Sequence, residues 1–111
     1  MTRSEEVITE WIAATNTHDA QQYLAAFTDD AVLDDPSVGS RFEGRAGIAE
    51  YYDSYFIGYN TTTRLVSISP EGDHIRVNVH FTGDFPGGET GGIFDVTLTG
   101  DKISFVRADL T

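Results

Sequence analysis

Apolar residues recur at helical spacing in the first half of the chain and alternate with polar residues in the second half. The first half predicts three helices, over about residues 4–16, 19–27 and 45–55, each with one apolar stripe. The first carries Val7, Ile8, Trp11, Ile12 and Thr15 on its inner face, and the others carry Tyr23, Leu24, Phe27, Ile48, Tyr51, Tyr52 and Tyr55. Thr2 with Glu5, and Asp19 with Gln22, are typical helix-capping pairs.

The second half predicts four strands, over residues 61–69, 74–81, 93–99 and 102–109. Turn-forming residues separate them, at residues 70–73, in a glycine-rich loop over 83–92, and at Gly100-Asp101. Regular alternation in the last strand places Ile103 and Phe105 on one face and Val106 on the other. Helices followed by hairpins predict one α+β domain over residues 1–111, with an antiparallel sheet packed on helices.

Residues 29–36, Asp-Asp-Ala-Val-Leu-Asp-Asp-Pro, concentrate four carboxylates around an apolar triplet. Residues 31–33 predict a short buried strand, and Pro36 favours an extended backbone at Asp35. We interpret Asp29, Asp30 and Asp34 as solvated turn and cap residues. Two interpretations of Asp35 stay open: a carboxylate aimed into an apolar space, where it is a better proton acceptor than a solvated one, or a simple turn cap.

The composition argues against several classes of function. The net charge of −11 argues against nucleic acid and anionic membranes as partners, and no apolar run approaches the length of a membrane span. The absence of cysteine excludes disulfides and thiolate chemistry, and we expect a cytoplasmic protein. His18, His74 and His80 lack metal-ligand spacing on any one element, so we predict neither a metal site nor a cofactor.

A set of short motifs resembles the nuclear-transport-factor-2-like superfamily, in particular bacterial ketosteroid isomerases and SnoaL-like polyketide cyclases. The motifs are Trp11-Ile12, Asn16-x-x-Asp19, Phe27-x-Asp29-Asp30-Ala31-Val32-x-x-Asp35-Pro36, Gly44, Ile48 and Tyr51-Tyr52. The resemblance implies a cone-shaped α+β domain, whose curved sheet wraps a helix and leaves an apolar pocket.

The resemblance also implies roles for particular residues. Asp35 occupies the place of the aspartate that moves a proton between two substrate carbons. The two places of the family's hydrogen-bond donors hold Trp11 and Phe94, and Asp95 follows Phe94. Because a shift of one residue reverses the face of a strand, Asp95 is expected to point away from the pocket unless a bulge intervenes. Tyr52 keeps a supporting tyrosine, so Trp11 and Tyr52 are the candidate donors.

The expected function is cofactor-free proton transfer on a small, largely apolar ring compound that carries a carbonyl group, steroid-like or polyketide-like, with Asp35 as the base. The alternatives are a non-enzymatic binding domain with the same pocket and a SnoaL-like cyclase. We expect a homodimer through the outer face of the sheet, because Ile103 and Phe105 need cover. Strand alternation and the resemblance predict that one cavity is surrounded by Trp11, Phe27, Tyr52, Ile75, Val77, Val79, Phe94, Val96 and Val106.

Overall fold

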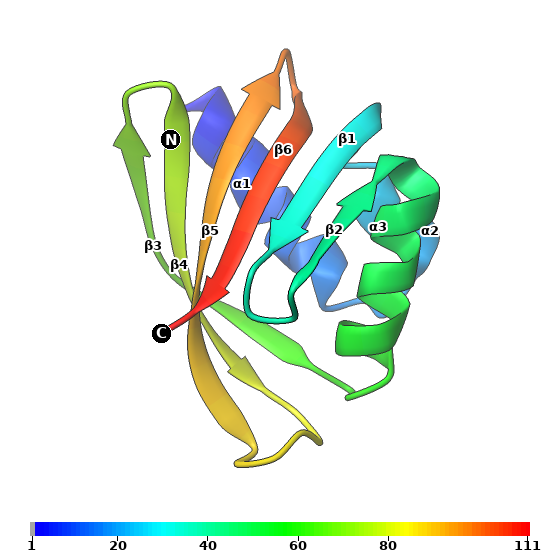
Figure 1. Ribbon diagram of the computed structural model, residues 1–111. Helices are drawn as coiled ribbons and strands as arrows, with labels where there is room; N and C mark the ends of the chain where they lie inside the picture. The colour runs from blue at the N-terminus through cyan, green and yellow to red at the C-terminus, as the bar shows by residue number, and fades with distance from the viewer. Residues whose placement is uncertain (1) are drawn as a thin grey trace.

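The computed structural model describes residues 2–111 and shows an α+β fold with a curved, six-stranded sheet (Figure 1). The helices are α1 (Arg3–Thr15), α2 (Ala20–Leu24) and α3 (Gly44–Tyr52), and a π-helical turn, η1 (Asp53–Ile57), continues α3. The strands are β1 (Phe27–Asp35), β2 (Ser40–Glu43), β3 (Thr62–Glu71), β4 (His74–Thr82), β5 (Glu89–Thr99) and β6 (Lys102–Leu110). The predicted fold class is confirmed, and the cone shape stays a prediction.

The sheet is mixed, with the strand order β2-β1-β6-β5-β4-β3. Every neighbouring pair is antiparallel except β1 and β6, which are parallel, so the expectation of a purely antiparallel sheet is wrong. Hairpin turns force an antiparallel course on β3 to β6. They do not constrain β1, because β2, α3 and three further strands separate it from β6 in the chain. In Figure 1, α1 lies behind the central strands and α3 lies beside β1 and β2.

Local capping signals position the first two helices as predicted. The Thr2 hydroxyl accepts a hydrogen bond from the Glu5 N–H at 3.2 Å, and the Glu5 carboxylate accepts one from the Thr2 N–H. Asp19 accepts the N–H groups of Gln21 and Gln22. The second helix ends at Leu24, earlier than predicted, because the parallel pairing with β6 draws Phe27 into β1.

Three segments of the sheet extend beyond the predicted strands. β1 extends over nine residues, whereas a strand was predicted only over residues 31–33. β2 forms at Ser40–Glu43, where no strand was predicted, and β5 begins at Glu89, inside the predicted glycine-rich loop. Backbone pairing explains all three differences, since it needs no apolar side chain on the paired residue.

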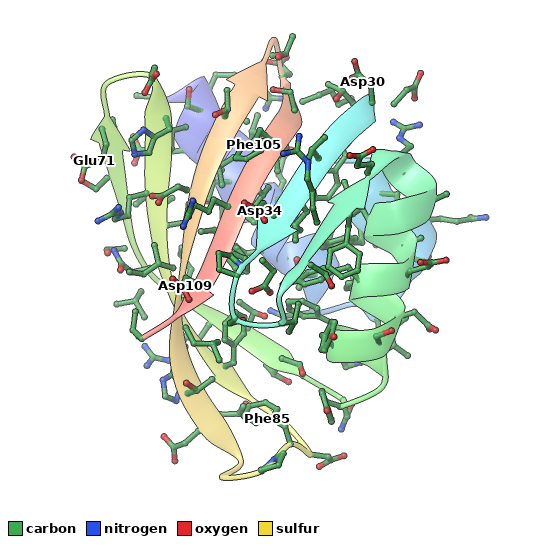
Figure 2. The ribbon with its side chains drawn as sticks, in the orientation of Figure 1. Asp30, Asp34, Glu71, Phe85, Phe105 and Asp109 are labelled. Atoms are coloured by element: carbon green, nitrogen blue, oxygen red, sulfur yellow. The ribbon has the colours of Figure 1, made fainter. Side chains whose placement is uncertain are left out.

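A β-bulge in β6 overturns the predicted faces of the last strand. Leu98 pairs with Ile103 and Thr97 pairs with Phe105, which leaves Ser104 as an extra residue. Ile103 and Val106 therefore both point inward and are fully buried, whereas Phe105 lies on the open face of the sheet (Figure 2). The expectation that Ile103 needs cover from a partner is wrong.

The inner faces of β4 and β5 follow the predicted alternation. Val77, Val79, Phe94 and Val96 are buried in one core with the apolar side of α1 and α3. Within residues 2–111, no helix is long and apolar enough to cross a membrane.

Candidate functional site

One end of the core opens into a cavity of about 260 Å³ with a mostly apolar wall. The wall is built by the end of β1 and the turn after it, by α3 and η1, and by the ends of β4, β5 and β6. Its lining residues are Asp35, Ser37, Val38, Tyr51, Tyr55, Phe56, Tyr59, Thr61, Phe81, Phe85, Thr90 and Leu110. Asp35 is the single charged residue among them.

Asp35 reaches this cavity because alternation along β1 points its side chain inward with Ala31 and Leu33. Asp35 is only 5% exposed. The neighbouring Asp34 is less buried and lies on the open face of the sheet (Figure 2). One carboxylate oxygen accepts the Ser37 N–H at 3.0 Å and the Ser37 hydroxyl at 2.5 Å. Asp35 is thus a turn cap and a cavity residue at once, so the structure combines the two interpretations that the sequence left open.

Tyr51 lines the cavity with Asp35, and its hydroxyl group is close enough to feel the charge of the carboxylate. It lies on α3 and is buried against Phe42, Tyr55 and Phe56. Burial raises the pKa of the Tyr51 hydroxyl well above its usual value, and the negative charge of nearby Asp35 adds to that rise. Tyr51 therefore stays protonated at neutral pH and presents an O–H donor next to the carboxylate.

Aromatic rings form the rest of the cavity wall toward its mouth. Tyr55 lies between Tyr51 and Tyr59, with ring centroids 5.5 and 6.5 Å away. Tyr59, 38% exposed, meets Phe85 edge-on at 6.0 Å. Phe85, labelled in Figure 2, belongs to the loop that joins β4 and β5 at one end of the sheet.

Two glycines near these rings leave no room for a side chain. Gly58 closes the π-helical turn by donating its N–H to the Asp53 carbonyl at 2.8 Å, and a Cβ there would lie 2.6 Å from the Ser54 carbonyl oxygen. A Cβ on Gly83 would lie 2.9 Å from both the Phe85 ring and the Tyr59 carbonyl oxygen. A side chain at Gly83 would therefore displace Phe85, and one at Gly58 would press on the backbone of η1.

The two donors implied by the resemblance lie in the core and do not line this cavity. The Tyr52 hydroxyl donates to the Thr15 carbonyl at 2.8 Å, and its ring stacks on Tyr23 at 4.0 Å. Trp11 packs against Phe27 and Phe94, and its indole N–H has no hydrogen-bond partner among the described residues. Catalytic roles for Trp11 and Tyr52 stay predictions that the geometry does not favour.

The other predicted wall residues are also separate from the cavity at Asp35. Phe27, Val77, Val79, Phe94 and Val106 pack in the core behind it. Ile75 and Val96 line a second hollow of about 370 Å³, between the start of α1 and the turn that joins β3 to β4. The regular pairing of β4 with β5 turns Asp95 outward, where Arg76 holds it at 3.0 Å.

Sequence reasoning missed most of the aromatic wall. Tyr51, Tyr55 and Tyr59 recur every four residues, which is a visible signal for one shared face, and Thr61 follows closely. Phe81 and Leu110 carry no such signal, because the folded sheet alone brings the ends of their strands to this place. Within residues 2–111, histidine, aspartate and glutamate form no group of three able to hold a metal ion.

Comparison with known proteins agrees with this architecture. The SnoaL-like domain model matches residues 8–109. No curated protein matches the chain. The fold resembles a Sinorhizobium meliloti protein provisionally assigned as a polyketide cyclase, with 18% identity and a TM-score of 0.84 over 97% of this chain and 99% of that one.

Two further structures of the same fold contain ligands. A Catenulispora acidiphila protein of ketosteroid-isomerase-like fold, in complex with trimethylamine, is 18% identical, with a TM-score of 0.81 over 93% of this chain and 83% of that one. A Mycobacterium tuberculosis protein in complex with estradiol-17beta-hemisuccinate is 20% identical, with a TM-score of 0.81 over 97% and 93%. At such identities these structures establish the fold, and the family match over residues 8–109 shows that the chain belongs to the SnoaL-like family.

Proposed function

We propose that the cavity binds a small carbonyl compound and that Asp35 transfers a proton between two of its carbons. The observation that carries this proposal is a buried carboxylate facing an aromatic cavity with a protonated tyrosine beside it. Such a pair supplies what enolisation needs, namely a base for the C–H proton and a donor for the oxygen that becomes negative. No cofactor is required for this step.

The proposed reaction balances within the substrate. Asp35 accepts the proton of a carbon next to the carbonyl group, and the C–H electron pair forms the enolate double bond. Tyr51 donates a hydrogen bond to the enolate oxygen while its charge develops. The proton then returns from Asp35 to a different carbon, so the product is an isomer of the substrate and the enzyme is regenerated.

A second candidate is binding without chemistry. It is favoured by the position of Trp11 and Tyr52, since the two donors implied by the family resemblance lie outside the cavity. In that case the cavity would retain ligand affinity, and Asp35 would only cap its turn. A SnoaL-like cyclase reaction would use the same carboxylate on a longer substrate.

We also propose that the chain works as a homodimer through the open face of the sheet, with Phe105 and not Ile103 as the apolar contribution. A cytoplasmic location stays a prediction.

The test is the isomerisation of 3-cyclohexen-1-one to its conjugated isomer, followed by absorbance, with deuterium uptake from D₂O as a second readout. Asp35→Asn should lower kcat by about 10²–10⁴-fold, because it removes the base. Tyr51→Phe should lower kcat by about 10²-fold, because it removes one donor to the enolate.

Asp34→Asn is the matched control. It removes the same charge one residue away, on the opposite face of β1, and should retain full activity. Equal rates for Asp35→Asn and the unmodified protein would contradict the proposal. Ligand binding without turnover in the unmodified protein would favour the binding candidate.

A further inference from the structure

We propose that the ligand of this cavity is a small organic cation, such as a carbonyl compound that carries a substituted ammonium group. The inference rests on the proposed function only in taking the cavity at Asp35 as the ligand site. It adds the charge of the ligand, which the proton-transfer chemistry alone does not specify.

The wall of the cavity is an aromatic cage. Six of its twelve lining residues are aromatic: Tyr51, Tyr55, Phe56, Tyr59, Phe81 and Phe85. Toward the mouth, the Tyr59 ring lies at 40° to Tyr55 and at 80° to Phe85, so these rings line the cavity without stacking into a flat layer. Aromatic rings attract a cation within about 6 Å of the ring centroid, and cages of several rings are a known means of recognising substituted ammonium groups.

The charges of the lining have one sign. Asp35 is negative, and none of the residues that line the cavity is Lys, Arg or His. The two hydrogen bonds of Asp35 come from the backbone N–H and hydroxyl of Ser37, which are neutral groups. A bound cation would therefore be the first positive charge to face this carboxylate within the cavity, and an attraction at such a half-enclosed site is screened less than at the surface.

The charge of the whole chain acts in the same direction. With a net charge of −11, the protein attracts cations over long range and repels anionic ligands. The electric field of this net charge does not direct a ligand to the cavity in particular. It favours the approach of a cation over that of a neutral or anionic compound of the same shape.

The size of the cavity limits the ligand. A cavity of about 150 Å³ lined by apolar side chains holds benzene, so a space of about 260 Å³ accepts a single ring or a branched ammonium group with a short chain. A positive charge near the reacting carbon also stabilises an enolate, so a cationic ligand is compatible with the proposed proton transfer.

The experiment compares choline with 3,3-dimethylbutan-1-ol, a neutral compound of nearly the same shape, by titration followed with protein NMR. Choline has no carbonyl group, so its binding tests the charge preference independently of catalysis. We expect choline to bind at least tenfold more tightly than the alcohol, with its methyl resonances shifted by the aromatic rings.

Three variants locate the effect. Tyr59→Leu, at a partly exposed ring that the fold tolerates losing, should weaken choline binding about threefold to tenfold and leave the alcohol unchanged. Asp35→Asn should weaken choline binding similarly, without weakening the alcohol. Phe105→Leu removes an aromatic ring from the open face of the sheet, away from the cavity, and should change neither ligand.

Equal or tighter binding of the alcohol would overturn the inference, as would no measurable binding of choline up to about 10 mM, where millimolar affinity is detectable. A loss in Phe105→Leu equal to that in Tyr59→Leu would overturn it too, because the cation would then bind elsewhere. These results are separate from the isomerisation test. Turnover that depends on Asp35 with no preference for choline leaves the proposed function intact, and choline binding without turnover leaves the charge preference intact.

Discussion

At the scale of single residues, Asp35 joins a structural and a proposed chemical role in one side chain. Its inward direction comes from alternation in β1, and its first hydrogen bonds come from Ser37, two residues later. Both relations are local in the sequence. The partner that gives the carboxylate its proposed chemistry, Tyr51, lies on a different element, and only the fold brings the two together.

The stability of Asp35 variants separates these roles. Asp35→Asn keeps the oxygen that accepts the Ser37 N–H and hydroxyl, so the free energy of unfolding at pH 7 should stay unchanged or rise. Asp35→Ala leaves the Ser37 N–H without its acceptor and should lose about 1–2 kcal/mol. Thermal melts of both variants at pH 7 measure this. A clear drop for Asp35→Asn would mean that the charge itself stabilises the turn, which would count against the catalytic interpretation.

Buried tyrosines predict a loss of stability in alkaline solution. Burial raises the pKa of Tyr23 and Tyr51 above the value of about 10 for an unfolded chain. Above pH 10 the unfolded state loses these protons while the folded state keeps them, so stability that is fully present below pH 10 falls as the pH rises.

Urea unfolding between pH 8 and about 11 should show this fall, with a slope of about 1.4 kcal/mol per pH unit for each such tyrosine. Tyr23→Phe should reduce this slope by the contribution of one tyrosine, about 1.4 kcal/mol per pH unit. The same slope in Tyr23→Phe as in the unmodified protein would show that other groups cause the alkaline loss.

At the scale of elements, β5 and β6 show that pairing with a neighbouring strand can change the side-chain directions and strand bounds predicted from one strand alone. The bulge at Ser104 places both Ile103 and Val106 inside, against simple alternation. In β5, Gly91 and Gly92 resemble loop residues in the sequence but pair with β4. The Phe81 ring of β4 occupies the space that a side chain on Gly92 would need.

Gly92 therefore controls the cavity through Phe81. In Gly92→Ala the new methyl group meets the Phe81 ring, which lines the cavity, and we expect a loss of about 1–3 kcal/mol together with weaker ligand binding. Gly91→Ala is the matched control, because its methyl group meets the side chain of Thr111, the exposed last residue, which can move aside. Chemical denaturation and the choline titration measure the two effects. Equal losses in both variants would contradict the role of Phe81.

At the scale of the whole molecule, the open face of the sheet carries a row of alternating charges. Cross-strand pairing places Arg41, Asp34, Arg107, Asp95 and Arg76 in one line across five strands. Phe105 lies on the same face, two residues before Arg107 in β6, where it pairs with Thr97 (Figure 2). The face thus combines charge with a limited apolar area.

If two copies pair through this face, their association should depend on salt. We expect light scattering to show a dimer at micromolar concentration in 0.15 M salt, and partial dissociation at about 1 M salt, where charges are screened within about 3 Å. Phe105→Lys should weaken the dimer without unfolding the protein, because Phe105 is outside the core. A monomer at low salt would rule out this interface and leave the fold unaffected.

The sequence by itself determined the features that depend on neighbouring residues. Helix caps at Thr2 and Asp19 and the inner faces of β4 and β5 all follow from spacing along a few residues, whereas the sequence left the direction of Asp35 open. The family resemblance added the correct fold.

Only the tertiary structure decided the rest. Parallel pairing of β1 with β6, the presence of β2 and the bulge at Ser104 depend on backbone hydrogen bonds between distant segments, which side-chain periodicity does not encode. The position of the cavity depends on where the packed side chains of the core leave space unfilled. The residues predicted as its wall are large enough to fill the centre of the sheet. The space therefore lies at the end of the sheet, where Tyr51, Tyr59, Phe81 and Phe85 line it together with Asp35.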